Sequence, residues 1–171
     1  LRERNFILCF LGDDAYAFVH RTFLEYFCAT EIKERFDKRG TDGGLEFDKL
    51  RDQVFAQHWQ DEGWHEVLRL VIGLIDAQFA GELIEWLLEQ KINRAECLDG
   101  IRLKPTGLMN VLLAADCVGD VRERTAIGAI DQGVLDRLKR EIEYEYPYLL
   151  TSDAAKALIF AMTAYWSDHS Q

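Results

Sequence analysis

Proline is scarce in this sequence of 171 residues, where only Pro105 and Pro147 occur. Because proline removes a backbone donor and breaks helices, its scarcity leaves long segments free to be helical. Hydrophobic residues make up 49% of the chain, which is enough to build a sizeable core. The length suggests one large domain or two small ones.

Basic residues are also few compared with acidic ones. Twenty lysines and arginines stand against 30 aspartates and glutamates, which gives a formal net charge of −10. Such an acidic surface repels phosphate backbones, so we expect no nucleic-acid partner. The densest basic cluster contains Arg137, Lys139 and Arg140, next to Glu141 and Glu143. We interpret it as a solvated helix face rather than a groove for nucleic acid.

The four cysteines, at positions 9, 28, 97 and 117, have no C-x-x-C or other zinc-site spacing. Cys9, Cys28 and Cys117 lie in apolar stretches, so each is predicted to be a small buried residue. Reduced thiols and the lack of a visible signal peptide predict a cytoplasmic location. The longest apolar stretch, Val67 to Ala80, contains charged residues and is too short to span a bilayer, so no membrane partner is expected.

Two motifs that often carry chemistry are missing. The sequence contains no G-x-x-x-x-G-K-[ST] phosphate loop and no G-x-S-x-G nucleophile turn. Without a phosphate loop the chain cannot hold ATP phosphates in the usual way. We therefore expect it not to be an enzyme on its own, and to hold no cofactor.

The apolar pattern changes character near residue 20. Asn5 to Leu11 and Ala15 to Val19 are short apolar runs on either side of a Gly-Asp-Asp turn, which predicts a β-hairpin. From His20 the apolar residues recur at helical spacing as far as about Lys38. Glycines at 40, 43 and 44 then predict a loop.

The remainder of the chain is predicted to be helical, with no strand after residue 45. Helices are expected over 45–58, 64–76, 79–90, 107–118, 125–144 and 151–166, while 91–104 is expected to be irregular. A weak repeat relates Val67-Leu68 to Val111-Leu112, 44 residues later, and a third apolar helix begins at Ala157. HEAT and armadillo repeats have periods of about 40–47 residues. The predicted fold class is therefore mainly α, with an N-terminal β-hairpin followed by a HEAT-like helical array.

The best candidate metal ligands are His58, Asp61, Glu62 and His65, which would share one face of a continuous helix. His65 also begins a segment similar to the zinc-protease motif H-E-x-x-H, but Arg69 replaces the second histidine, and a cation there opposes metal binding. We prefer the alternative of a helix start, with Asp61 or Glu62 near the positive end of the helix dipole. No metal site is therefore predicted.

Two further features have both a local and a functional interpretation. His20, where the second strand gives way to a helix, could cap the turn or could face a phosphate supplied by another domain. The aromatic segment Tyr144 to Tyr148 could pack at a helix end forced by Pro147 or could form a contact patch. The residues alone favour the local interpretation in both cases.

The segment Tyr16 to Ala29, with the sequence YAFVHRTFLEYFCA, resembles the F-x-H-x-[ST]-F-x-E-[YF]-x-A signature of NACHT-type signalling NTPases. In that family the signature belongs to the winged-helix domain after the ATPase core, and the hairpin before it resembles the wing. His58 to Leu70, HWQDEGWHEVLRL, is similar to a segment of bacterial members, and Leu112 to Cys117 is similar to a later one. The resemblance covers nearly the whole chain. The sequence does not begin with methionine, and we expect it to be a piece of a longer protein.

The resemblance implies that His20 contacts the nucleotide diphosphate in the resting state and holds the winged helix against the ATPase core. Residues 1–40 would be the end of the winged-helix domain and residues 45–171 a HEAT-like domain. The implied partners are the upstream ATPase core of the same chain and an unknown protein or ligand at the C-terminal repeats. ATP or ADP and magnesium would be cofactors of the full-length protein. The remaining residues of the family motif are Phe18, Arg21, Thr22, Phe23, Glu25 and Tyr26.

Under this hypothesis the chain is a non-catalytic region that couples an ATPase switch to sensor repeats in bacterial signal transduction, for example in antiphage defence. The alternative is a HEAT-like scaffold whose acidic surface binds a protein partner without any nucleotide link. A metal-dependent hydrolase comes third. A phosphate loop upstream would favour the first hypothesis, and its absence the second.

Overall fold

The computed structural model describes residues 7–13, 15–92, 98–99, 102–103 and 108–145. This part of the chain is mainly helical, and an antiparallel two-stranded hairpin precedes the helices, as the sequence predicts. The chain divides into two compact units, residues 1–74 and 75–171, here called the N-terminal and C-terminal units. The domain boundary predicted between residues 40 and 45 stays a prediction.

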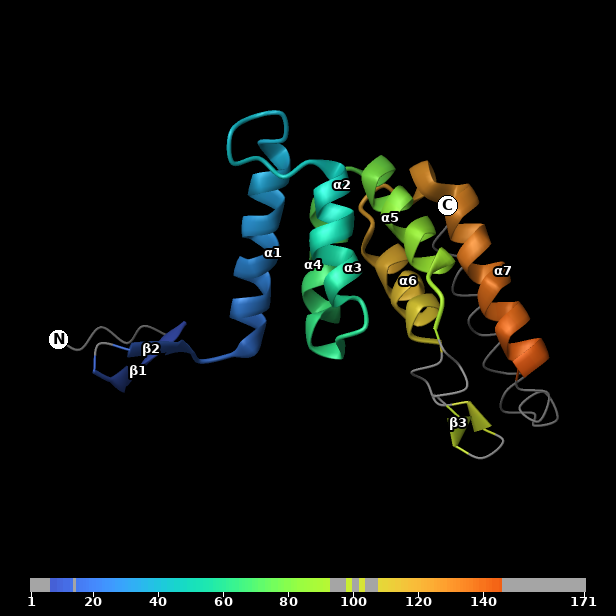
Figure 1. Ribbon diagram of the computed structural model, residues 1–171, viewed down its shortest axis with the longest axis horizontal. Helices are drawn as coiled ribbons and strands as arrows, with labels where there is room; N and C mark the ends of the chain where they lie inside the picture. The colour runs from blue at the N-terminus through green and yellow to red at the C-terminus, as the bar shows by residue number, and fades with distance from the viewer. Residues whose placement is uncertain (1–6, 14, 93–97, 100–101, 104–107, 146–171) are drawn as a thin grey trace. The chain divides into compact units, whose positions relative to one another are not determined.

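The predicted hairpin is present in the N-terminal unit. Strand β1, Leu8–Gly12, pairs with β2, Ala15–Phe18, and Leu8 lies opposite Phe18. Asp13 in the turn has φ of 48°, in the left-handed region that aspartate tolerates better than most residues. Only two residues separate the end of β2 from helix α1, Arg21–Asp37, so the hairpin adjoins the N-terminal end of α1 (Figure 1).

Helix α1 packs against α4, His65–Leu74, to form the body of the N-terminal unit (Figure 1). Its contribution to the core includes Ala29 and Phe36, both of which are almost fully buried. The loop after α1 has positive φ at Gly40 and Gly43, 80° and 81°, a backbone conformation that glycine adopts without strain. The buried side of α4 contains Val67, Leu68, Val71 and Ile72.

The helix predicted for residues 45–58 is present over residues 47–58, but its middle is wider than an α-helix. Helix α2, Phe47–Lys49, continues as the π-helix η1, Leu50–Phe55, and ends as α3, Ala56–His58. The buried residues Leu45, Leu50 and Phe55 are spaced five apart. Hydrogen bonds from i to i+5 in the π-helix suit this spacing better than the α-helical repeat does.

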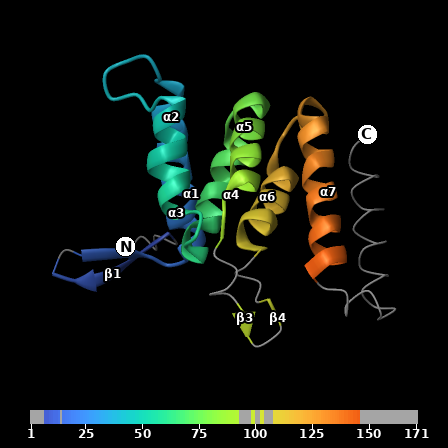
Figure 2. The ribbon, with the colours of Figure 1, turned by 45° about the vertical axis from the view of Figure 1, so that its right-hand side comes forward.

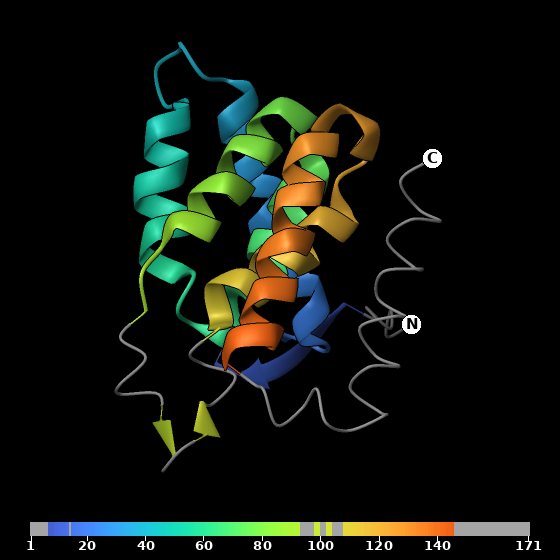
Figure 3. The same cartoon turned by 90° about the vertical axis from the view of Figure 1, so that its right-hand side faces the viewer.

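Three helices form the described part of the C-terminal unit. They are α5, Ala77–Glu89, α6, Met109–Asp120, and α7, Gly128–Glu145, with the 3₁₀ turn η5, Arg124–Ile127, before α7. Helix α5 packs on α6 and α7, and α6 also packs on α7, as Figures 2 and 3 show. A Cβ atom at Gly81 of α5 would lie 2.6 Å from Ile130 Cδ1, so glycine permits the close approach of α5 and α7.

The expectation of no strand after residue 45 is wrong. Strand β3, Leu98–Asp99, pairs antiparallel with β4, Arg102–Leu103. Each strand has only two residues, too few to produce an alternating pattern in the sequence. The pairing sets Leu98 opposite Leu103 and Asp99 opposite Arg102.

The burial pattern of α4 recurs in α6, but 46 residues later rather than the predicted 44. The four buried positions of α4 correspond at this offset to Leu113, Ala114, Cys117 and Val118, all of which are buried. Leu112, which the predicted offset equates with buried Leu68, is 42% exposed. The predicted helix over residues 151–166 and the segment Tyr146 to Tyr148 lie outside the described residues. In the part of the chain that the structure describes, no helix has the length and apolar character to cross a membrane.

Candidate functional site

His20 occupies the N-cap position of α1, with an extended backbone, φ −126° and ψ 136°. Its carbonyl accepts a hydrogen bond from the Phe23 N–H at 3.1 Å, but its side chain makes no capping bond. The imidazole is exposed and packs only loosely on the Phe23 ring, with 6.2 Å between the ring centroids. Among the described residues neither ring nitrogen has a hydrogen-bond partner, so the imidazole is accessible to a group from outside this chain.

Arg21, the first residue of α1, links the two segments that carry the family resemblance. Its Nε donates to Glu25 Oε1 at 2.6 Å, and its Nη2 donates to the Gly63 carbonyl oxygen at 2.5 Å. The Arg21 side chain is 66% exposed, whereas Glu25 is only 13% exposed. Gly63 lies 42 residues further along, in the turn before α4. The start of α1 is therefore tied by a side-chain bond to the start of α4.

Aromatic contacts attach the hairpin to α1. The rings of Phe18 on β2 and Phe27 on α1 have centroids 5.7 Å apart, within the range of favourable aromatic pairs. Tyr26 and Phe27 meet edge to face at 5.8 Å. Thr22 is exposed and Phe23 is half-buried. Of the motif residues, Phe18, Arg21, Glu25 and Tyr26 make local contacts, while His20 and Thr22 are exposed and their side chains make no hydrogen bond among the described residues.

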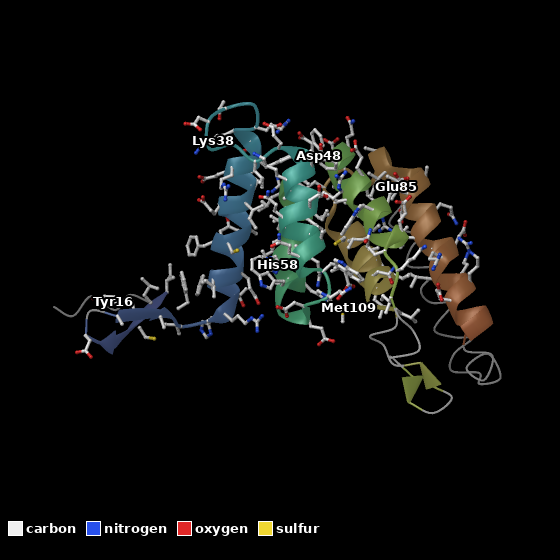
Figure 4. All side chains as sticks on the ribbon, in the orientation of Figure 1. Tyr16, Lys38, Asp48, His58, Glu85 and Met109 are labelled. Carbon is white, nitrogen blue, oxygen red and sulfur yellow. The ribbon has the colours of Figure 1, made fainter. Side chains whose placement is uncertain are left out.

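Exposed apolar side chains are concentrated around this motif. Among the described residues, seven large hydrophobic side chains are exposed, and all but Leu112 lie between residues 7 and 27. Tyr16 on the hairpin, labelled in Figure 4, is the most exposed at 63%. Exposed apolar side chains that lie on adjoining elements are available for contact with another protein surface. We call this set of six the hairpin–helix face: Ile7, Tyr16, Val19, Leu24, Tyr26 and Phe27.

Three of the four candidate metal ligands, His58, Asp61 and His65, have another partner. The backbone leaves the helix after His58, which removes the continuous face that would bring them together. His58 stacks on Trp64 with centroids 3.8 Å apart (Figure 4), and His65 Nε2 lies 2.8 Å from the Trp59 carbonyl oxygen. Asp61 accepts from the Gly63 N–H as the cap of the 3₁₀ turn η2, Glu62–Trp64, which is the helix-start role that we preferred.

The prediction of a buried cysteine is confirmed for Cys117 and only in part for Cys28. Cys117 in α6 is fully buried, and Cys28 in α1 is half-buried, where desolvation raises the pKa of its thiol. The prediction that Cys9 is buried is wrong, because Cys9 is exposed on β1. Successive residues of a strand point to opposite faces, and here Leu8 is half-buried while Cys9 faces solvent. Cys97 lies outside the described residues.

Sequence reasoning missed the partner of Arg21 and the environment of two other arginines. A glycine carbonyl has no signature in a sequence, so the bond from Arg21 to Gly63 could not be foreseen. Arg140 is exposed, as expected for a solvated face, but Arg137 and Arg140 also line a cavity in the C-terminal unit. Their i, i+3 spacing does place them on one side of α7, and that spacing was the available signal.

Comparison of the chain with protein-family models, with curated proteins and with solved structures found no match.

Proposed function

We propose that this chain is a non-catalytic regulatory region of a NACHT-type signalling NTPase, and that His20 senses the nucleotide held by an ATPase core upstream in the same polypeptide. The proposal starts from the resemblance of residues 16–29 to the family signature. The full-length protein would use ATP or ADP with magnesium. The chain itself, which has no phosphate loop, would neither hydrolyse ATP nor bind it tightly.

The observation that carries the proposal is the exposure of His20 next to the hairpin–helix face. A residue that reaches a phosphate on another domain has to leave its own domain with its donor groups unused, and the His20 imidazole meets this condition. A domain contact also has to bury apolar surface, which the hairpin–helix face supplies. His20 and five of the six residues of the hairpin–helix face lie on the segment that resembles the family signature, and Ile7 precedes it.

The bond between Arg21 and Gly63 supplies a route for transmission. His20 and Arg21 are adjacent, and Arg21 reaches the turn that leads into α4. A displacement of the α1 N-terminus after nucleotide exchange would therefore pull on the start of α4. Coupling of this kind requires an element with two arrangements that the ligand favours unequally. In this proposal that element is the docked or released hairpin–helix face.

The test compares two histidines in the full-length protein. His20→Ala should weaken ADP binding and lower the signalling threshold, because one charge-assisted hydrogen bond contributes about 1.5–3 kcal/mol. This free energy corresponds to roughly a tenfold to hundredfold shift between closed and open forms. The control is His58→Ala, which removes a stacked imidazole outside the motif and should leave ADP affinity unchanged. Calorimetry with ADP gives the affinities.

Melting temperatures of the 171-residue chain complete the experiment. His20→Ala should leave the melting temperature unchanged, since its side chain makes no hydrogen bond within the described residues. His58→Ala should lower it, because the stack with Trp64 is lost. If His20→Ala destabilises the chain and ADP affinity stays at the wild-type value, the sensing role is refuted.

The second candidate, a scaffold that binds a protein partner without a nucleotide link, is also compatible with the hairpin–helix face. The two functions differ in whether nucleotide controls that face. Hydrogen exchange of residues 7–27 in the full-length protein should be slow with ADP and faster with a non-hydrolysable ATP analogue if the chain is nucleotide-coupled. Equal exchange with both nucleotides would favour the scaffold.

A further inference from the structure

The C-terminal unit contains a cavity of about 600 Å³ that is unrelated to the family motif. It lies where the end of α5 and the residues after it meet α7, and buried Asn110 of α6 also lines it. Small-molecule sites in proteins commonly have volumes of about 300–1,000 Å³. The cavity is therefore large enough for a compact organic ligand.

The charge of the cavity lining is opposite to that of the whole chain. The chain carries a formal charge of −10, yet Lys91, Arg137 and Arg140 line the cavity against a single acidic residue, Glu89. Clefts lined by one sign of charge attract ligands of the opposite sign. Arg137 is paired with Glu141, so Lys91 and Arg140 leave the cavity basic, which favours an anionic ligand.

The basic side chains that line the cavity have unused hydrogen-bond donors. Arg137 uses Nε to bond Glu141 Oε1 at 2.7 Å, and Arg140 uses Nε to bond the Asp136 carbonyl oxygen at 3.3 Å. Neither bond uses the terminal guanidinium nitrogens, and within the described ranges these nitrogens and Lys91 Nζ have no recorded partner. The bond to Glu141 also holds the Arg137 side chain in place. Arginine with a free terminal edge is well suited to carboxylate and phosphate oxygens.

The other residues of the lining leave space in the cavity and supply apolar surface for a ligand. A Cβ added at Gly133 of α7 would meet no atom within 4 Å, so the missing side chain leaves space at the wall of the cavity. Leu88 and Ile92 supply apolar surface beside the cations. Asn110 donates to the carbonyls of Leu87 and Gln90, which satisfies acceptors at the end of α5 that would otherwise repel an anion.

We propose that this cavity binds a small amphipathic anion, with a phosphate or carboxylate group on Lys91, Arg137 and Arg140 and an apolar part on Leu88 and Ile92. The proposal does not depend on the nucleotide-sensing role of His20, since every residue that carries it lies in the C-terminal unit. It gives Arg137 and Arg140 of the basic cluster a role in addition to forming a solvated helix face.

The test is an NMR titration of the 171-residue chain with octyl phosphate, inorganic phosphate and octyl glucoside. Octyl phosphate should bind saturably and shift the amides of Lys91, Ile92 and residues 133–140. Inorganic phosphate should shift the same amides with weaker affinity, and octyl glucoside should shift none. Affinity for octyl phosphate should fall as salt is added, because the contact is electrostatic.

Two glycine variants provide a matched pair. Gly133→Leu should abolish binding, because the new side chain occupies the cavity. Gly119→Leu should bind as the wild type does, since Gly119 also sits in a helix with open space around its Cβ position but does not line the cavity. The double variant Lys91→Gln with Arg140→Gln should bind octyl phosphate at least tenfold more weakly, and it decides the question if Gly133→Leu fails to fold.

Three results would overturn the proposal. One is octyl glucoside binding as tightly as octyl phosphate, which would show that charge is not recognised. Another is wild-type affinity in the double variant or in folded Gly133→Leu. The third is a set of shifted amides confined to residues 7–27, which would show that the probe binds the exposed hairpin–helix face instead.

Discussion

Asn110 should be a large contributor to the stability of the C-terminal unit although it is polar. It is 4% exposed, and its side-chain amide donates to the carbonyls of Leu87 at 3.2 Å and Gln90 at 2.9 Å. Those carbonyls belong to the last turn of α5 and the residue that follows it, where helices leave acceptors unsatisfied. The side chain of α6 thus caps α5, and the bonds join two helices that also pack together.

Replacing Asn110 with alanine removes both bonds and leaves buried carbonyl oxygens with fewer donors. Each bond contributes about 1 kcal/mol, and an unsatisfied buried group adds to the loss, so we expect a total of about 2–3 kcal/mol. For a chain of this length that loss lowers the melting temperature by about 4–12 °C. The control is Gln132→Ala, whose amide bonds only the exposed carboxylate of Asp136 and whose loss should cost less than about 0.5 kcal/mol.

Asn110→Asp separates the hydrogen bonds from packing, because the two side chains are nearly the same size. The ionised carboxylate cannot donate to the two carbonyls, and burial would raise its pKa above that of aspartate in the unfolded chain. The stability of this variant should therefore be highest below the unfolded pKa and should fall as pH rises toward 7. Urea unfolding of the three variants at two pH values tests the reasoning. Equal stability of Asn110→Ala and Gln132→Ala would refute it.

Four further predictions concern mainly the N-terminal unit. Gly44→Ala should lower the free energy of unfolding by about 1–3 kcal/mol in urea, since its Cβ would lie 2.1 Å from the Lys38 carbonyl oxygen. The control Gly119→Ala, which has open space around its Cβ, should raise the free energy of unfolding by up to about 1 kcal/mol. A fully stable Gly44→Ala would contradict this prediction. Iodoacetamide should label Cys9 first, Cys28 next and Cys117 last, as read by mass spectrometry. Because burial raises the pKa of the Cys28 thiol, the free energy of unfolding should fall as pH rises through the ordinary thiol range. This fall should be smaller in Cys28→Ser, and an unchanged pH profile in that variant would contradict the prediction. Arg21→Gln should speed amide hydrogen exchange in residues 60–64, because the bond from Arg21 to the Gly63 carbonyl is lost. The control Arg51→Gln, which loses only exposed ion pairs, should not change exchange there. Identical exchange in the two variants would show that the bond between Arg21 and Gly63 does not hold this turn.

Helices could be predicted from this sequence because their cause is local and periodic. The buried positions of α4 and α5 recur every three or four residues, and the few prolines leave the pattern uninterrupted. The hairpin was predictable for a similar reason, since a Gly-Asp-Asp turn separates two apolar runs. The π-helical middle of residues 47–58 was not expected, although the five-residue spacing of Leu45, Leu50 and Phe55 was visible.

The features that could not be predicted depend on pairs of residues far apart in the chain. Asn110 interrupts an apolar stretch, and nothing in the sequence indicates that its partners are the carbonyls of residues 87 and 90. The cavity likewise needs α5 and α7 to be placed side by side before Lys91 and Arg140 become neighbours of one space. The prediction for Cys9 failed for another reason. Its neighbours in the sequence are apolar, which suggested burial, but Cys9 is exposed in the hairpin.

The proposed function depends on two adjacent residues at the start of α1, His20 and Arg21. His20 ends the extended segment and leaves its imidazole exposed, while Arg21, the next residue, begins the helix and bonds a carbonyl in the turn before α4. One side chain is therefore available to another domain and its neighbour is attached within this one. A bond from His20 to a nucleotide would fix the position of the backbone to which Arg21 belongs, and loss of that bond would release it. The turn at Gly63, and the helix α4 that follows it, would then report the nucleotide state without contacting the nucleotide.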